Sequence, residues 1–273
     1  MSHPTIRLLA LDLDGTLLKG KRGISPRVRA AIAAAQRNHA KVTIATGRMF
    51  QSARRFAHDL DVQIPIICYQ GALVRHPVSN ETLISTVLPI EPALAVHSFA
   101  TSANLHLNAY VNDKLYMETI TPAGQFYADT SEVDIHLTKD LRIEIERGTA
   151  KLAIVTDEGR VPTVLDALAT RVGNRLEVTR SHPRFVETTR PGVDKGTGLR
   201  TLARATNVPI EETMAIGDNM NDLPLVVAAG IGVAMGDGDT RVRDAANWVT
   251  GTYDDDGVAT AIERFVLKTD TGA

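Results

Sequence analysis

The sequence predicts an α/β protein, in which a doubly wound parallel sheet is built from both ends of the chain and carries an inserted α+β unit. Over residues 6–69, short apolar segments alternate with helical segments. The same alternation returns after Asp194, and a region without it separates the two parts. Because strands that alternate with helices pair in parallel through right-handed crossovers, we expect both ends to share one sheet.

The first part of the chain predicts three strands and two helices. Residues 6–11 form a short apolar run that stops at a polar turn, which is typical of a buried strand. Ser25 can cap a helix and Pro26 suits its first turn, so we expect a helix from there to Asn38. A strand, a helix and a third strand are then expected at residues 42–45, 49–60 and 64–69.

The middle of the chain is expected to form the separate α+β unit. Asn112 and Asp113 stand between two strand-like segments and are typical of a hairpin turn. Strand-like and helical segments follow there without the regular alternation of the two ends. The expected strands are 105–111, 114–117, 151–156, 175–179 and 185–188, and the expected helices are 92–103 and 161–172.

The last part of the chain returns to alternating strands and helices. A helix is expected from Asp194 to about Thr206, and another from Asp222 to Gly230. Buried strands are expected at residues 213–217 and 231–235, and a final helix at 258–267. We therefore predict a core of residues 1–85 and 188–273 and an inserted unit of residues 86–187.

Charge and hydropathy argue against two kinds of partner. The 30 basic and 32 acidic residues give a net charge of −2, without the basic excess that nucleic-acid binding favours. No apolar run approaches the ~20 residues that span a bilayer, and residues 1–4 start no signal-peptide pattern. Cys68 is the only cysteine, so an internal disulfide is excluded. We expect a cytoplasmic protein that binds neither nucleic acid nor membrane.

Four polar clusters fall at the ends of predicted strands or at the start of a predicted helix. In open α/β sheets, ligands bind at the carboxyl ends of the strands, so we expect these clusters to share one cleft. Asp12 and Asp14 are two residues apart in an extended segment, which lets both side chains face that cleft. The clusters are Asp12-Leu13-Asp14-Gly15-Thr16, Thr46-Gly47-Arg48, Asp194-Lys195-Gly196 and Gly217-Asp218-Asn219-Met220-Asn221-Asp222.

These clusters resemble, in the same order along the chain, the motifs of haloacid dehalogenase superfamily phosphatases. The resemblance is closest to the Cof-like group, which carries an inserted α/β cap. It covers roughly residues 6–75 and 188–266, whereas the cap is matched only by its position and length. One departure is Gln70, because the family usually has asparagine before the glycine at this point.

The resemblance implies a magnesium-dependent phosphatase that works through an aspartyl-phosphate intermediate. Asp12 would be the nucleophile and Asp14 the general acid and base. Asp12, Asp218 and the backbone carbonyl of Asp14 would hold Mg²⁺, which prefers oxygen ligands. Asp222 would be a further ligand or an anchor for Lys195 and the waters on the metal.

The same resemblance assigns the groups that bind the phosphoryl oxygens. Lys195 would supply a positive charge and Thr46 a hydroxyl, and both belong to the predicted catalytic set. The amides of Gly47 and Asn221 would add further donors. Such donors stabilise the charge that spreads over the phosphoryl oxygens in the transition state.

Several other polar residues allow a structural interpretation. Arg48 more often forms a surface ion pair than binds substrate, and we leave it outside the catalytic set. His182 could face the substrate, but a turn before a strand is the commoner role of a His-Pro pair. The run of residues 254–256 is typical of a solvated loop and helix cap. The hairpin around Asn108, Tyr110 and Asn112 is a hypothesis for substrate contact.

The predicted substrate is a small phosphorylated metabolite, such as a sugar phosphate or a related phosphomonoester. The cap is expected to close over the cleft, exclude water and select the leaving group. Two alternatives stay open, namely a phosphotransferase similar to phosphomannomutases and a non-catalytic module that binds a phosphorylated metabolite. Asp14 argues against the second alternative, because binding alone needs no acid or base. The sequence does not predict the oligomeric state.

Overall fold

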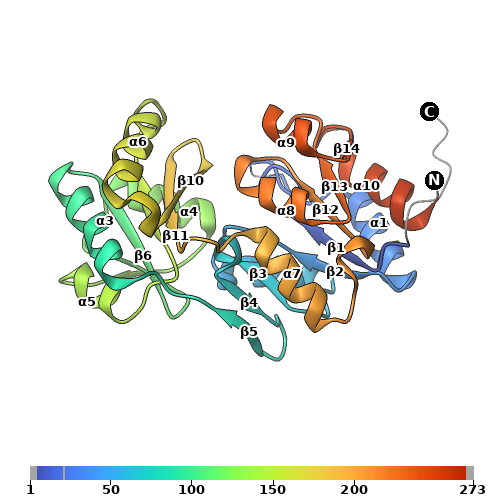
Figure 1. The fold of residues 1–273 in the computed structure, drawn as a ribbon, viewed down its shortest axis with the longest axis horizontal. Helices are drawn as coiled ribbons and strands as arrows, with labels where there is room; N and C mark the ends of the chain where they lie inside the picture. The colour runs from blue at the N-terminus through green and yellow to red at the C-terminus, as the bar shows by residue number, and fades with distance from the viewer. Residues whose placement is uncertain (1–4, 21, 269–273) are drawn as a thin grey trace.

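The computed structural model describes residues 5–20 and 22–268, and these form two lobes that lie side by side (Figure 1). Each lobe is built around its own large sheet. Residues from both ends of the chain make one lobe, and residues from the middle make the other. Residues 1–4, for which the sequence predicts no signal peptide, lie outside the described residues.

The sheet of the first lobe has five strands, and all of its described pairings are parallel. Its first strand in the sequence, β1, lies inside the sheet, paired on one side with a strand that comes about two hundred residues later. The prediction that both chain ends share one parallel sheet is therefore confirmed. The order is β14 (Trp248–Val249), β13 (Ile231–Ala234), β12 (Thr213–Gly217), β1 (Leu8–Leu11) and β2 (Lys41–Ile44).

Helices cover both faces of this sheet, because alternate residues of its buried strands point to opposite sides. Leu9 and Leu11 belong to the same apolar cluster as residues of α1 (Pro26–Arg37), α2 (Phe50–Asp59) and α10 (Gly257–Ile262). Leu8 and Ala10 belong to the cluster that contains residues of α7 (Lys195–Ala205) and α8 (Leu223–Ala228). A short helix, α9 (Thr240–Ala245), packs beside α8. We call this part of the molecule the core lobe.

A small antiparallel sheet extends the core lobe toward the other lobe. It consists of β3 (Ile66–Cys68), β4 (Leu73–Arg75) and β5 (Thr82–Ser85). The sequence predicts that β3 joins the parallel sheet, but the parallel contact is limited to one bridge between Ala45 and Ile67. The chain turns back directly after β3, where Tyr69 and Gln70 have positive φ angles, and β4 then pairs with it.

The sheet of the second lobe is mainly antiparallel, in agreement with the predicted α+β unit. Asn112 and Asp113 both have positive φ, as a tight hairpin turn requires. The spatial order is β10 (Glu177–His182), β11 (Phe185–Thr189), β9 (Leu152–Val155), β6 (His106–Val111), β7 (Lys114–Met117) and β8 (Ile135–Leu137). We call this part the cap lobe, and its exact division from the core at residues 85 and 188 stays a prediction.

The two faces of the cap sheet pack against different partners. One face lies on α3 (Ile90–Ser102), α5 (Leu141–Glu146) and α6 (Val161–Val172). The other face carries α4 (Pro122–Ser131) and is turned toward the core lobe. There the ring of Tyr110 meets the ring of Tyr69 edge to face, with 5.8 Å between the centroids. Side chains of the cap sheet can therefore reach the ends of the core strands.

Candidate active site

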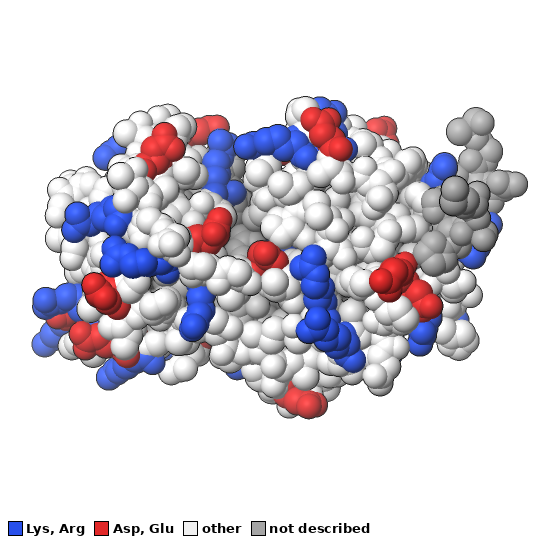
Figure 2. Space-filling view, viewed as in Figure 1, with Lys and Arg blue, Asp and Glu red and all other residues white. Residues whose placement is uncertain are grey.

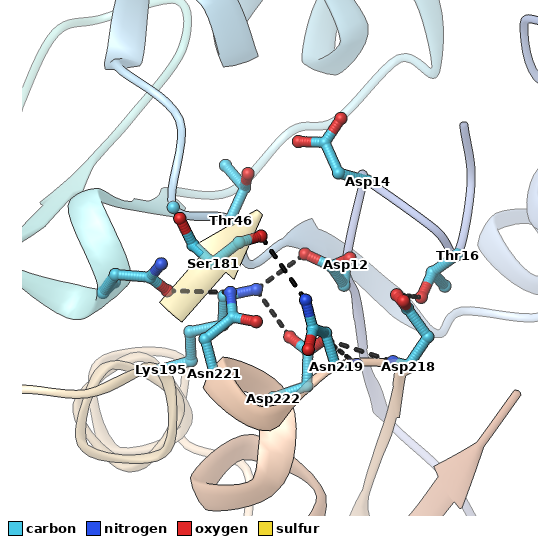
Figure 3. A network of polar contacts seen from close by, with 12 residues as sticks. Asp12, Asp14, Thr16, Thr46, Ser181, Lys195, Asp218, Asn219, Asn221 and Asp222 are labelled. Atoms are coloured by element: carbon cyan, nitrogen blue, oxygen red, sulfur yellow. Dashed lines mark hydrogen bonds and ion pairs between the residues drawn. The ribbon is translucent and has the colours of Figure 1, made fainter. Parts of the chain in front are cut away.

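The predicted site residues come together at one edge of the parallel sheet. Asp12 directly follows β1 and Asp218 directly follows β12, while Lys195 opens α7. Figure 3 shows Asp12, Lys195, Asp218 and Asp222 with their side chains directed toward one another. The sheet topology explains this meeting, because β1 and β12 are parallel neighbours whose carboxyl ends coincide.

The ammonium group of Lys195 links two of the carboxylates. Its Nζ donates hydrogen bonds to Oδ1 of Asp12 at 2.6 Å and to Oδ1 of Asp222 at 2.5 Å, and all three side chains are buried. Burial alone would lower the pKa of Lys195, but the two carboxylates raise it above its ordinary value. The residue is therefore a permanent cation beside the predicted nucleophile.

The carboxylates of this cluster outnumber its ammonium group. Asp12, Asp218 and Asp222 each offer an oxygen, and these oxygens lie within 4.8 Å of one another. Burial and the nearby Asp222 raise the pKa of Asp218 to about 7, and the same two causes raise the pKa of Asp12. An excess of buried oxygen ligands with unfavourable mutual repulsion fits a hard divalent cation such as Mg²⁺.

A glycine allows Asp218 to approach the loop that carries Asp12. Gly15 has a φ of +98°, and a Cβ atom on it would lie 2.1 Å from Oδ2 of Asp218. The hydroxyl of Thr16 donates to the other oxygen of Asp218 at 2.9 Å. Any side chain at position 15 would therefore displace Asp218 from the cluster.

Asp222 has hydrogen-bond partners on both of its oxygens. Oδ1 accepts from Lys195, and Oδ2 accepts from the backbone amides of Asp218 at 3.1 Å and Asn219 at 3.0 Å. The carboxylate thus fixes the loop after β12 and the lysine at the same time.

Asp14 faces away from the Lys195 cluster and pairs with Arg48. Figure 3 shows its carboxylate pointing out of the cluster. Nε and Nη2 of Arg48 donate to its two oxygens at 2.7 and 2.5 Å. The Asp14 side chain is 53% exposed and that of Arg48 only 13%. The expectation that Arg48 forms an ion pair holds, but its partner is the predicted acid and base, which sequence reasoning did not foresee.

The loop after β2 brings Thr46 and Gly47 to the same edge. The hydroxyl oxygen of Thr46 accepts from the backbone amide of Arg48 at 3.1 Å. A Cβ atom on Gly47 would lie 2.4 Å from Nε2 of Gln70, so a side chain at position 47 would displace the glutamine amide. Oε1 of Gln70 in turn accepts from Nδ2 of Asn221 at 3.1 Å, which ties the two predicted phosphate-binding loops together.

A cavity of about 90 Å³ lies between this edge and the cap lobe. This volume is large enough to hold water or a small polar group. Among the described residues there are also larger cavities of about 560 and 650 Å³. The first is lined by none of the predicted site residues, and the second reaches Lys195 and Asn221 but not Asp12, which lines the small cavity. The core lobe lines the small cavity with Asp12, Asp14, Thr46, Gly47, Arg48 and Asn221, and the cap lobe with Tyr127, Thr130, Ser131, Lys151, Ser181, His182, Phe185 and Glu187.

His182 lines this cavity, although the sequence favoured a simple turn. Its Nδ1 accepts a hydrogen bond from the backbone amide of Arg184 at 3.1 Å, and its ring stacks on Phe185 with 4.3 Å between centroids. Burial is the main cause that lowers its pKa. A neutral ring that accepts at Nδ1 carries its proton on Nε2, so it can act as a donor.

The other candidates lie apart from the cavity. Asn108 and Tyr110 are buried, and neither lines it. Asp256 precedes α10, but its side chain accepts from Ser25 at 2.5 Å and makes no capping hydrogen bond to that helix. Asp254 pairs with Arg22 at 2.5 Å. These acidic residues therefore hold the loop before α10 against the N-terminal part of the chain.

Two further features bear on partners. On the face drawn in Figure 2, basic side chains are spread over both lobes with acidic ones among them. Among the described residues, no helix combines the length and apolar character needed to cross a membrane.

Comparison with known proteins places this site in a family. The sequence pattern of the family described as haloacid dehalogenase-like hydrolase matches residues 9–262. The chain is 31% identical over 268 residues to YitU of Bacillus subtilis, a 5-amino-6-(5-phospho-D-ribitylamino)uracil phosphatase. This match covers 94% of the chain and 97% of YitU.

Solved structures show the same arrangement of lobes. A haloacid dehalogenase-like hydrolase from Bacteroides thetaiotaomicron is 34% identical in sequence to this chain and superposes with a TM-score of 0.85. The match covers 95% of this chain and 99% of the hydrolase. The subclass IIB sugar phosphatase BT4131 is 25% identical with a TM-score of 0.82, covering 95% of this chain and 98% of that one.

Proposed function

Because the chain belongs to the haloacid dehalogenase-like hydrolases and is a phosphatase of that family, we propose that it hydrolyses a small phosphorylated metabolite through a phosphorylated Asp12 with the help of Mg²⁺. The observation that carries this proposal is the cluster of Asp12, Asp218 and Asp222 beside the buried ammonium of Lys195, which contacts Asp12 and Asp222. A buried carboxylate beside a fixed cation, at the wall of a small polar cavity, is suited to attack an electrophilic phosphorus.

In the first transfer, a carboxylate oxygen of Asp12 attacks phosphorus while the bond from phosphorus to the leaving oxygen breaks. Asp14, once protonated and released from Arg48, gives its proton to that oxygen, so that the product leaves as an alcohol. Lys195, Thr46 and the amides of Gly47 and Asn221 donate to the phosphoryl oxygens. Each of these four residues lies within the site or on its wall.

In the second transfer, a water molecule attacks the phosphorus of the acyl phosphate. Asp14, now ionised, takes a proton from this water, and the bond between phosphorus and the Asp12 oxygen breaks. Inorganic phosphate leaves and Asp12 is a free carboxylate again. The high exposure of the Asp14 side chain suits this exchange of protons, because the group can reach both the cavity and solvent.

Mg²⁺ would be held by Asp12, Asp218 and the backbone carbonyl of Asp14. When bound, the ion would neutralise the negative charge that the carboxylates and the phosphate bring together. We propose that Asp222 anchors Lys195 and the loop after β12 and does not ligate the ion directly, because both of its oxygens already accept hydrogen bonds.

For the substrate we propose a sugar phosphate or a related phosphomonoester. The cavity is small and lies against the cap lobe, so we expect the rest of the substrate to contact the cap lobe at its rim. His182 and Phe185 present a donor and an aromatic surface there. BT4131 is a sugar phosphatase, whereas YitU acts on a phosphate ester that carries both a sugar-alcohol chain and a planar uracil ring.

The test is phosphate release from a panel of phosphorylated metabolites, with Mg²⁺ and with EDTA. We expect Mg²⁺-dependent release of inorganic phosphate, and a labelled phosphoryl group on Asp12 when the reaction is quenched with acid. An isomeric sugar phosphate without free phosphate would instead show a phosphotransferase. Phosphate release in which no label is ever trapped on the protein would exclude the covalent intermediate.

A further inference from the structure

A buried ion pair of the cap lobe reaches the site from the side opposite the carboxylate cluster. Lys151 lies just before β9 and Glu187 lies on β11, and their Nζ and Oε1 atoms are 2.5 Å apart. The two side chains are only 1% and 3% exposed. Burial tends to lower the pKa of Lys151, but Glu187 and Tyr127 together keep the pKa above its ordinary value. The ammonium of Lys151 thus has a carboxylate partner, although it lies in the interior.

Lys151 also contacts the loop that carries Thr46. Its Nζ donates to the backbone carbonyl of Gly47 at 2.8 Å. The amide of the same peptide unit belongs to Arg48 and donates to the hydroxyl oxygen of Thr46. Because the carbonyl and amide of one peptide lie in a plane and polarise each other, the ammonium fixes and strengthens this donor. The Thr46 hydroxyl keeps its own proton, which it can donate to a ligand in the cavity that it lines.

Glu187 is connected to Asn221 by two hydrogen bonds through Gln70. Its Oε2 accepts from Nε2 of Gln70 at 3.0 Å, and Oε1 of Gln70 accepts from Nδ2 of Asn221 at 3.1 Å. Glu187 thus determines which end of the Gln70 amide faces Asn221. An asparagine amide has two protons, and Gln70 engages one of them, which leaves the other for a ligand. At position 70 the chain departs from the asparagine that is usual in the family.

We propose that Lys151 and Glu187 are positioning residues for the phosphoryl group, acting on Thr46 through the Gly47–Arg48 peptide and on Asn221 through Gln70. This inference rests on the proposed function. It assigns to the cap lobe a role in binding the phosphoryl group, in addition to contact with the leaving group. The phosphoryl site is then complete only when the cap lobe is seated on the core lobe.

The first experiment is Lys151→Met, compared with Lys114→Met as a matched control. Lys114 is exposed on β7 of the same sheet. We expect Lys151→Met to lower kcat on every substrate, p-nitrophenyl phosphate included, by about 10- to 100-fold, the range typical of a lost charge-assisted hydrogen bond. Affinity for vanadate, which mimics the transferred phosphoryl group, should fall by a similar factor. Lys114→Met should change neither quantity.

A double-mutant cycle separates positioning from a merely structural role. Thr46→Val removes the hydroxyl and keeps the volume of the side chain. Vanadate affinity is measured for Lys151→Met, for Thr46→Val and for the double variant. If Lys151 acts through Thr46, the fold loss in the double variant is at least about fivefold smaller than the product of the two single fold losses. If the fold loss in the double variant equals that product to within about twofold, Lys151 acts independently of Thr46 and the inference is wrong.

Lys151→Met leaves Glu187 buried without its partner, so a variant that replaces the whole pair is also needed. Apolar residues of similar size often replace a buried ion pair without loss of stability. We expect the Lys151→Met/Glu187→Met variant to fold with a Tm near that of the wild type and still to lose vanadate affinity. Wild-type kcat and vanadate affinity in this variant would overturn the inference. A wild-type protein that releases no phosphate would instead overturn the proposed function.

Discussion

Lys195 in the core lobe and Lys151 in the cap lobe are both buried and both contact carboxylates, but the charge around them differs. Lys195 contacts Asp12 and Asp222, and Asp218 lies close by, so three carboxylates face one ammonium. Lys151 contacts Glu187 and a neutral carbonyl, so its surroundings are balanced. An excess of clustered carboxylates, and not a buried lysine as such, therefore marks the place where a metal and a phosphoryl group are expected.

The largest expected effect comes from Asp12→Asn, which tests whether the core cluster is reactive. We expect kcat to fall at least ~10³-fold, or about 4 kcal/mol in the barrier, because the amide cannot form the phosphorylated intermediate. The measurement is phosphate release at saturating substrate, with a thermal melt to show that the variant folds. Substantial activity in a folded variant would remove Asp12 from the role of nucleophile.

Asp14→Asn should have the next largest effect and should separate the two transfers. p-Nitrophenolate needs little protonation, so the first transfer should proceed, whereas the second lacks its base and slows by about 10²-fold. We therefore expect a burst of about one nitrophenolate per protein before slow turnover, measured by stopped flow. A variant that turns over this substrate steadily at the wild-type rate would exclude Asp14 as the base.

The excess of carboxylates predicts how stability depends on pH without Mg²⁺. Asp218 has a pKa of about 7 in the folded protein, above its ordinary value of 3.8. Because the folded protein binds this proton more tightly than the unfolded chain, the proton stabilises the fold fully below about pH 4, and this stabilisation is lost as pH rises through 7. We expect the Tm in EDTA to fall by a few degrees between pH 5 and 8. Added Mg²⁺ should raise the Tm more at pH 8 than at pH 5.

Asp218→Asn is the control for this pH dependence, because the amide has no proton to lose. Its Tm in EDTA should fall less between pH 5 and 8 than that of the wild type. A wild-type Tm that is independent of both pH and Mg²⁺ over this range would contradict the cation site.

The smallest expected effect concerns the cap contact with the leaving group. His182→Ala should change the ranking of substrates by about tenfold and leave activity on p-nitrophenyl phosphate within about threefold, since the ring lies on the cap side of the cavity. The measurement is kcat/KM over the metabolite panel, with His136→Ala on β8 as the matched control. An equal loss on every substrate would mean that His182 does not select among them.

The core lobe and its predicted site could be foreseen because local signals determine them. Ser25 accepts from the amide of Val28 at the predicted start of α1. The clusters at Asp12 and Asp218 follow short apolar runs, and parallel pairing of those runs brings the clusters together. The roles of the individual site residues stay predictions until variants are measured.

The features that the sequence did not reveal depend on contacts between distant segments or on very short elements. The hairpin of β4 and β5 has strands of three and four residues, and α4 contains Gly124, so neither shows a clear periodicity. The pairing of Arg48 with Asp14 crosses 34 positions of the chain. Lys151 and Glu187 reach the site only because one lobe packs against the other, which no local pattern encodes.

The parallel pairing of β1 with β12 also has a consequence for biosynthesis. The interior strand β1, which ends next to the proposed nucleophile, gains one of its two neighbours only after the ribosome has made more than two hundred further residues. Contacts so distant in sequence form slowly, so the nascent core lobe keeps an unpaired strand edge until β12 has been made. A chain stopped before Thr213 would therefore contain Asp12 but would lack the strand that completes its surroundings.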